Sequence, residues 1–343
     1  MSETQNIRKS RYFPPQVSAA GWQAANFPTL ESITYRLTDT DLADLDRAIG
    51  PMLDAGVKYQ ATSKADFRLD GFSAALDAMT HEVSDGRGFA LIRGLPVLDR
   101  GKEWGRMAAW AIGTYFGTAV SQTRDGTMMA DVMDVTKGQS GPRGYNSNAE
   151  LRLHTDPASD LIALCCLEAA KSGGESILAS SVSVYNEIAA KRPDLLEPLY
   201  EGFFYHRFSE GPVDAGPISE VRVPIFTSDG NEVLCRYGRQ RIKAAHDELG
   251  LPLSATEIES LDFFNEVANS DDLSLHFKLQ PGDFLVANNL KTLHARTNFE
   301  DNEDPARPRH LLRLWLASEQ TGARALNFLN HGECGIPKRD AAA

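Results

Sequence analysis

Cysteine is scarce in this chain, with four among 343 residues, which is too few for a disulfide framework. Cys165 and Cys166 are adjacent within an apolar run and are predicted to be buried free thiols, whereas Cys235 and Cys334 are isolated. This usage fits a reducing compartment, so we expect a cytoplasmic protein.

Long hydrophobic runs are also missing. No stretch approaches the roughly 18 consecutive apolar residues of a transmembrane helix. Residues 1–11 are polar and lack the apolar region of a secretory signal. We therefore expect no membrane partner.

Positive charge is in deficit, since 35 Lys and Arg face 47 Asp and Glu and give a net charge of -12. This balance disfavours nucleic acid and anionic membranes as partners, although it allows a local basic pocket for a small anion. The hydrophobic share of 42% and the charged share of 24% are ordinary for a soluble globular protein.

Short apolar runs separated by turn residues dominate the chain after residue 150. Apolar spacing predicts helices over 38–53, 70–83, 104–116, 184–191 and 256–267. Strands are predicted over 88–94, 160–167, 177–181, 203–208, 222–226, 232–237, 275–279, 284–287 and 310–317.

This order predicts a mainly β protein with flanking helices and a double-stranded β-helix (jelly-roll, cupin-like) core. Without a repeat or linker, we expect 1–343 to form a single domain. Residues 1–85 would be helical or irregular decoration, about 88–317 the core, and 318–343 a tail. The segment 136–147, rich in Gly, Ser and Pro, is a candidate lid.

His154-Thr-Asp156 and the distant His294 are the strongest chemical signal. Residues i and i+2 of a strand point to one side, so His154 and Asp156 can reach one metal ion. Alone, such a tripeptide is usually an ordinary surface pair. With His294, however, two imidazoles and a carboxylate can hold one face of an octahedral Fe(II) and leave three positions open.

Arg309 and Arg313 accompany the last predicted strand. A period of two puts them on one face with Leu311 and Trp315, while the alternate residues look like sheet core. Inward-pointing arginines are costly unless they are paired. A guanidinium binds carboxylate bidentately, which suits a small diacid, and structural salt bridges to Asp or Glu are the alternative.

Five stretches occur in a recognisable order across about residues 88–317: Leu151-Arg-Leu-His-Thr-Asp156, Ser172-Gly-Gly-Glu-Ser176, Pro281-Gly-Asp283, Asn289 with His294, and Arg309-x-x-x-Arg313. Together they resemble the taurine dioxygenase/TfdA-like superfamily of Fe(II)- and 2-oxoglutarate-dependent oxygenases, which includes gamma-butyrobetaine hydroxylase-like enzymes. The resemblance implies that His154, Asp156 and His294 bind iron. Because Asp156 is not replaced by a small residue, a halogenase is not predicted.

The resemblance also implies roles around the metal. Arg309 would bind the 5-carboxylate of 2-oxoglutarate, and Ser176 would hydrogen-bond to this co-substrate. Arg313 would meet 2-oxoglutarate or an anionic group of the substrate. Asn289 would order the strand before His294.

Substrate residues are less clearly indicated. Tyr145, Asn148 and Glu150 precede the first ligand and could line the pocket mouth, with Glu150 meeting an amine, or be solvent-facing loop residues. Arg239 belongs to a basic cluster that could meet an acidic substrate or another subunit, or be a solvated face. The cluster consists of Arg236, Tyr237, Arg239 and Arg241.

The function implied is oxidation, most often hydroxylation, of an unactivated C–H bond with O₂, releasing succinate and CO₂. We expect a small anionic or zwitterionic substrate that bears a carboxylate, such as an amino acid. Desaturation, cyclisation, and a phosphonate or sulfonate substrate remain open. A zinc hydrolase and a non-catalytic jelly-roll module that binds an anion or a metal are the rival classes. Homodimers and homotetramers are common in the family that the chain resembles, and the sequence leaves the oligomeric state open.

Overall fold

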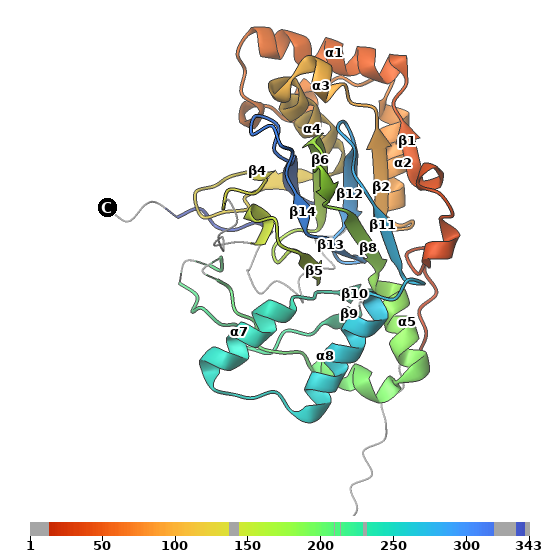
Figure 1. Cartoon of the computed structure of the whole chain (residues 1–343), viewed down its shortest axis with the longest axis vertical. Coiled ribbons are helices and arrows are strands. Elements are labelled where there is room, and N and C mark those ends of the chain that lie inside the picture. Colours follow the sequence, from red (N-terminus) through yellow and green to blue (C-terminus); the bar gives the residue numbers. More distant parts are fainter. Residues whose placement is uncertain are drawn as a thin grey trace, which may run out of the picture.

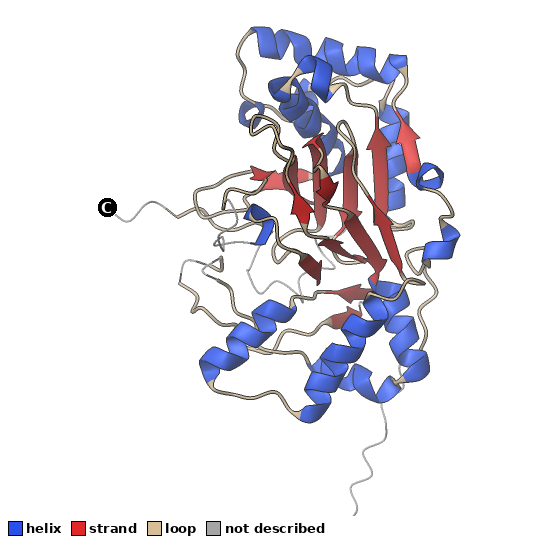
Figure 2. Cartoon of the chain, viewed as in Figure 1, coloured by secondary structure: helices blue, strands red, loops and turns tan. Residues whose placement is uncertain are grey.

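The computed structural model describes residues 14–136, 144–208, 210–212, 214–228, 232–318 and 334–339. Its strands form a central body between two groups of helices (Figures 1 and 2). α1–α4 gather at one end of this body, and α5, α7 and α8 gather at the other (Figure 1).

The larger sheet has seven strands in the order β1-β2-β12-β6-β15-β3, with β4 also pairing with β15. Only β1 and β2 run parallel among its pairs. Its strands are β1 (Thr34–Arg36), β2 (Phe89–Arg93), β3 (Thr118–Val120), β4 (Met129–Val132), β6 (Leu161–Glu168), β12 (Phe284–Asn288) and β15 (His310–Ala317).

The smaller sheet has the antiparallel order β11-β8-β13-β5. Its strands are β5 (Leu151–His154), β8 (Ser176–Ser180), β11 (Ser274–Phe277) and β13 (Thr292–Arg296). Two further antiparallel pairs are β9 (Phe226–Ser228) with β10 (Val233–Cys235), and β7 (Ser172–Gly173) with β14 (Phe299–Glu300).

The α-helices divide into a group before β3 and a group after β8. The first group is α1 (Asp39–Asp54), α2 (Ser73–Ser84), α3 (Val97–Arg100) and α4 (Lys102–Phe116). The second is α5 (Ser181–Lys191), α6 (Leu196–Glu201), α7 (Arg239–Leu249) and α8 (Ala255–Ala268). Short 3-10 helices are η1 (Ala24–Asn26), η2 (Leu30–Ile33), η3 (Tyr59–Ala61), η4 (Lys64–Asp66), η5 (Gly144–Asn146) and η6 (Pro193–Leu195).

Three hydrophobic clusters follow from strand alternation. On β15, Leu312 and Leu314 pack toward α1, α2 and α4, whereas Leu311 and Trp315 pack into a cluster that also contains Leu178 of the smaller sheet. The remaining face of the smaller sheet packs against α5 to α8. The chain is therefore layered as helices, sheet, sheet and helices, and residues between the sheets form the inner face.

Helix starts follow side-chain capping. Thr38 accepts a hydrogen bond from the backbone of Asp41 at the start of α1, and Ser254 accepts one from Glu257 at the start of α8. Each cap forms a capping box, which pairs backbone N–H groups that a helix start would leave unpaired. Both helix starts were predicted from the sequence.

The jelly-roll prediction is confirmed, with corrections at the level of elements. The predicted strands 203–208 and 222–226 are wrong over most of their length, since Phe203 and His206 make only isolated bridges and β9 begins at Phe226. Pro224 has no N–H to give to a ladder there. The helices α6 and α7 were not predicted.

The expected tail and the candidate lid are only partly described by the structure. Ile336, within the expected tail, packs into the cluster between the sheets and donates its N–H to the Ser121 carbonyl. Of the candidate lid 136–147, residues 137–143 lie outside the described residues. No helix of the described chain is long and apolar enough to cross a membrane.

The cysteine prediction is confirmed where it was specific. Cys165 and Cys166 are buried free thiols. Burial raises the pKa of Cys166 to about 12, so this thiol stays protonated and unreactive at neutral pH.

Candidate active site

The strands β5 and β13 are adjacent, and His154 and His294 are register partners on them. Their ring centroids are 4.3 Å apart. The Nε2 of His294 is 3.9 Å from Oδ2 of Asp156. One ligand atom from each of the three residues lies within 4.8 Å of the others, so the set can close on one metal ion.

The hydrogen bond of His154 fixes which of its nitrogens can bind a metal. Its Nδ1 is 2.8 Å from the carbonyl oxygen of Arg152, so Nδ1–H donates there and Nε2 keeps its lone pair. The buried Nδ1 of His294 has no hydrogen-bond partner among the described residues. The donor set of two imidazoles and one carboxylate fits Fe(II).

Asp156 is placed by Asn289 rather than by strand geometry. The prediction that His154 and Asp156 share one face of a strand is wrong, because β5 ends at His154. The Asn289 side chain accepts the Asp156 N–H and donates to the Asp156 carbonyl, both at 2.8 Å. Arg236 donates to the same carbonyl at 2.5 Å. Asn289 was expected to order the strand before His294, whereas its side chain binds the backbone of the other ligand, Asp156.

The electrostatics of the triad suit metal binding. Burial raises the pKa of the Asp156 carboxyl, but Arg313, the two histidines and the Trp315 N–H outweigh burial and lower it to about 2. Burial, with His154 alongside, lowers the pKa of His294 to about 3. The carboxylate is therefore ionised and the imidazole neutral at pH 7, as ligands must be.

Arg313 extends from the inner face of β15 toward Asp156, with Nη1 3.6 Å from Oδ1. Its Nε donates to Oε1 of Gln122 at 2.7 Å, and its Cζ lies 4.5 Å from the centroid of the Tyr145 ring. Gln122 is itself fixed, since its Nε2 donates to the carbonyls of Arg313 and Met128. Gln122 was not predicted as a site residue, because it lies outside the predicted strands.

Arg309 is 4% exposed, and no carboxylate forms an ion pair with its side chain among the described residues. Its Nη1 has no hydrogen-bond partner there, and its Cζ lies 4.9 Å from the centroid of Phe299. Burial lowers its pKa to about 10. Gly174, with φ of 68°, leaves room, because a Cβ there would lie 3.0 Å from Arg309 Nε. An unpaired buried guanidinium is a natural anion site.

Ser176 and Arg296 face each other across β8 and β13. Strand alternation puts them on the inner face with His294, because Leu178, opposite His294, belongs to the cluster between the sheets. The Ser176 hydroxyl has no protein partner in the described part of the chain, which leaves it available. Arg296 was not predicted from the sequence, although its position two residues after His294 indicates the same face of a strand.

The other expected substrate residues have different surroundings. Asn148 and Glu150 are exposed and precede the first residue of β5, so they do not share a strand face with His154. Arg239 forms an ion pair with Asp262 of α8 at 2.6 Å, and Arg241 forms one with Glu210 at 2.6 Å. Of the basic cluster, Arg236 and Tyr237 reach the ligand-bearing segment, Arg236 at the Asp156 carbonyl and Tyr237 through backbone hydrogen bonds with Thr155.

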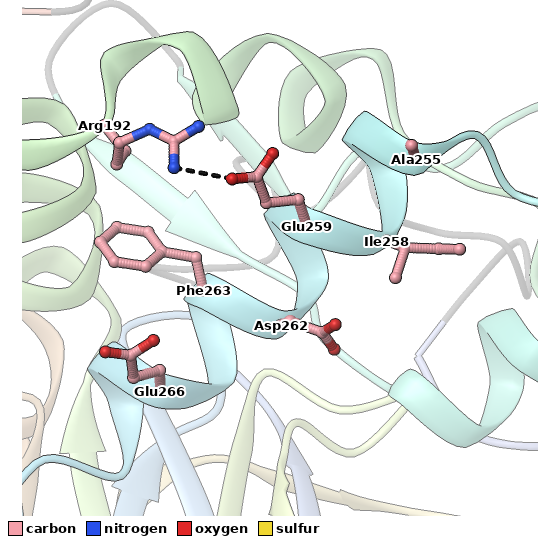
Figure 3. Close-up of a pocket in the computed structure, with 7 residues that line it drawn as sticks. All are labelled: Arg192, Ala255, Ile258, Glu259, Asp262, Phe263 and Glu266. Carbon is pink, nitrogen blue, oxygen red and sulfur yellow. Dashed lines mark hydrogen bonds and ion pairs between the residues drawn. The ribbon is translucent and has the colours of Figure 1, made fainter.

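A hollow of about 610 Å³ lies along α8 (Figure 3), and no residue of the triad lines it. Its charged lining residues are Arg192, Glu259, Asp262 and Glu266, and Arg192 forms an ion pair with Glu259. Because this hollow is acidic and contains no residue of the triad, we do not assign it to the reaction.

The sequence profile described as "Taurine catabolism dioxygenase TauD, TfdA family" matches residues 49–315. The chain belongs to this family. It is an Fe(II)- and 2-oxoglutarate-dependent dioxygenase, with O₂ as the other co-substrate. The matched residues include the triad, Arg309 and Arg313.

Family relatives extend over most of the chain. FR-33289 synthase of Streptomyces rubellomurinus is 29% identical over 89% of this chain and 91% of its own. The taurine hydroxylase-like protein SAT17 of Stachybotrys chartarum is 30% identical over 85% of this chain and 77% of its own.

Solved structures share the fold. An asparagine oxygenase with Fe(II), 2S,3S-3-hydroxyasparagine and succinate has a TM-score of 0.66 at 15% identity, covering 89% of this chain and 99% of that one. The non-heme iron oxygenase OrfP with Fe and alpha-ketoglutaric acid has a TM-score of 0.64 at 15% identity, covering 88% and 99%.

Proposed function

We propose that this dioxygenase hydroxylates an unactivated C–H bond of a small substrate that carries a carboxylate, such as an amino acid. The proposal rests on the surroundings of Arg313. This residue is 8% exposed, its Nε donates to Gln122, and its Nη1 is 3.6 Å from Oδ1 of Asp156. Once Asp156 binds a cation, that cation neutralises its negative charge. The Arg313 guanidinium can then pair with a second anion.

Under this proposal His154, Asp156 and His294 hold Fe(II), and Arg309 and Ser176 bind the distal carboxylate of 2-oxoglutarate. When bound, the iron with 2-oxoglutarate and O₂ supplies the oxidising chemistry, and succinate and CO₂ leave.

The protein's own part is placement. Trp315 donates to Asp156 Oδ2 at 2.7 Å and so fixes the carboxylate with Oδ2 beside His294 Nε2 and Oδ1 beside Arg313. Arg313 and the Tyr145 ring lie beside Asp156, so a carboxylate held there would keep the substrate close to the metal.

The substrate class has support from similar proteins. One solved structure of this fold is an asparagine oxygenase holding a hydroxyasparagine, and another is OrfP with succinate and (3S)-hydroxy-L-Arg. A guanidinium binds a phosphonate or sulfonate as readily as a carboxylate, so Arg313 leaves that choice to experiment. A homodimer or homotetramer in the cytoplasm stays a prediction.

Anaerobic titration with Fe(II) and 2-oxoglutarate tests the cofactor assignment. We expect a weak visible charge-transfer band in the wild type and in His81→Ala, a control at an exposed histidine of α2, and no band in His154→Ala. A folded wild type without a band at saturating iron would contradict the triad assignment.

A substrate panel tests the carboxylate. Amino acids, phosphonates and sulfonates of similar size are offered with 2-oxoglutarate, and substrate-dependent succinate release is measured. We expect amino acids to stimulate release, and Arg313→Gln to abolish the stimulation while the charge-transfer band persists. Stimulation by phosphonates or sulfonates alone would overturn the substrate class.

A further inference from the structure

Arg296 and Arg309 lie over the same aromatic ring. The Cζ atoms of Arg296 and Arg309 are 4.8 Å and 4.9 Å from the centroid of Phe299. Neither arginine forms an ion pair with a carboxylate in the described ranges, and Nε and Nη1 of Arg296 and Nη1 of Arg309 lack hydrogen-bond partners there. Two cations without an ion-pair partner among the described residues therefore lie close together in a buried site.

Arg296 also holds the chain segment Ser147–Ala149. Its Nη2 donates to the carbonyl of Ser147 at 2.8 Å and to that of Ala149. The N–H of Phe299 donates to the carbonyl between them, that of Asn148, at 3.1 Å. Three consecutive carbonyls are thus bound by Arg296 and by the residue whose ring it covers.

The anchored segment connects the two halves of the site. Just before it, η5 carries Tyr145, whose ring lies under the Arg313 guanidinium. Just after it, β5 carries His154. Any shift of Ser147–Ala149 would move Tyr145 relative to Arg313.

We propose that Arg296 is a positioning residue that couples occupation of the 2-oxoglutarate subsite at Arg309 to the placement of the Tyr145 ring under the Arg313 guanidinium. The inference rests on the proposed function, which assigns these two subsites. An anion bound at Arg309 offsets the repulsion between the two guanidiniums, so Arg296 holds Ser147–Ala149 more firmly. Co-substrate binding thereby completes the substrate subsite.

Hydrogen exchange of the amides in residues 144–150 measures this coupling without turnover. The probe is 2-oxoglutarate with Mn(II) in place of Fe(II), added to the full chain, and its affinity is measured by calorimetry on the same samples. In the wild type we expect exchange in 144–150 to slow by about tenfold, within the usual range of coupling between sites. Arg296→Gln should still bind 2-oxoglutarate but lose most of this slowing.

Two further variants separate coupling from simple loss of an arginine. Arg296→Lys keeps the charge, but its shorter side chain does not reach the position of Nη2, which donates to both carbonyls, so it should also lose the slowing. Arg87→Gln is the matched control, because Arg87 also covers aromatic rings, Phe27 and Phe89, and donates to a backbone carbonyl, away from the triad. Arg87→Gln should behave as the wild type.

The outcomes distinguish the two proposals. If the wild type and Arg296→Gln bind 2-oxoglutarate and show equal slowing in 144–150, the coupling role is wrong and the proposed function stands. If the wild type binds Mn(II) but not 2-oxoglutarate, the proposed co-substrate subsite fails, and the coupling role fails with it.

Discussion

Single residues decide the charge balance of the site, and Arg309 is the clearest case. Arg309→Ala should weaken 2-oxoglutarate binding by about 1.5–3 kcal/mol, the range for a lost charge-assisted contact. The free energy of unfolding should hold or rise, because the variant removes a buried cation that has no carboxylate partner in the described chain. Calorimetry and urea unfolding measure the two quantities.

Arg307→Ala is the control for that prediction. Arg307 is an exposed neighbour that forms an ion pair with Glu168, so its loss should leave 2-oxoglutarate affinity unchanged. Unaltered 2-oxoglutarate affinity in Arg309→Ala would instead show that another arginine binds the distal carboxylate of the co-substrate.

His294 gives the metal-free protein a pH-dependent stability. Its folded-state pKa of about 3 lies below the ordinary imidazole value of 6.5. Between these values the unfolded chain binds a proton that the folded chain does not, so stability falls as pH falls, by about 1.4 kcal/mol per pH unit. Asp156, with its pKa lowered to about 2, adds a loss in the same direction below its ordinary 3.8.

Urea unfolding with a chelator at pH 7 and pH 5 tests this slope. The wild type should lose about 2 kcal/mol more than His294→Asn over that interval. Equal losses in the two proteins would show that His294 is not held neutral by the fold.

At the scale of elements, the end of β12 and the turn that follows it place the carboxylate ligand Asp156. The adjacent residues Asn288 and Asn289 have different roles there, Asn288 in the stability of the fold and Asn289 in metal binding. Asn289→Ala should lower metal affinity by about 10- to 100-fold, since it removes both bonds to the Asp156 backbone. Asn288→Ala removes bonds to Val83 and Leu290 and should cost about 1–3 kcal/mol of stability without changing metal affinity. Mn(II) titration and urea unfolding measure both effects. Equal metal affinities in the two variants would contradict the role of Asn289.

Elements also show where sequence patterns were sufficient. The period of two on β15 correctly separated Leu312 and Leu314 from Arg313 and Trp315. The same rule failed for Asp156, because β5 ends two residues earlier and side chains from distant segments take over. Alternation predicts faces within a strand but not beyond its end.

For the whole molecule, the triad joins elements distant in the sequence, so ligands should stabilise the fold globally. Mn(II) at about 100 times its Kd should add about 2.7 kcal/mol and raise the Tm by a few degrees, and 2-oxoglutarate added with it should raise the Tm further. One cooperative transition that moves as a unit would support the single-domain prediction. Two transitions, of which one ignores the ligands, would contradict it.

The sequence by itself determined the jelly-roll class and predicted the triad and the arginine pair, because strand alternation, capping and metal-ligand chemistry are local or depend on residue type. Tertiary structure alone decided that Gln122 orients Arg313, that Asn289 places Asp156, and that Arg296 and Arg309 share the Phe299 ring. Those contacts join segments far apart in the chain. Their partners are selected by how the two sheets pack against each other, which no local pattern encodes.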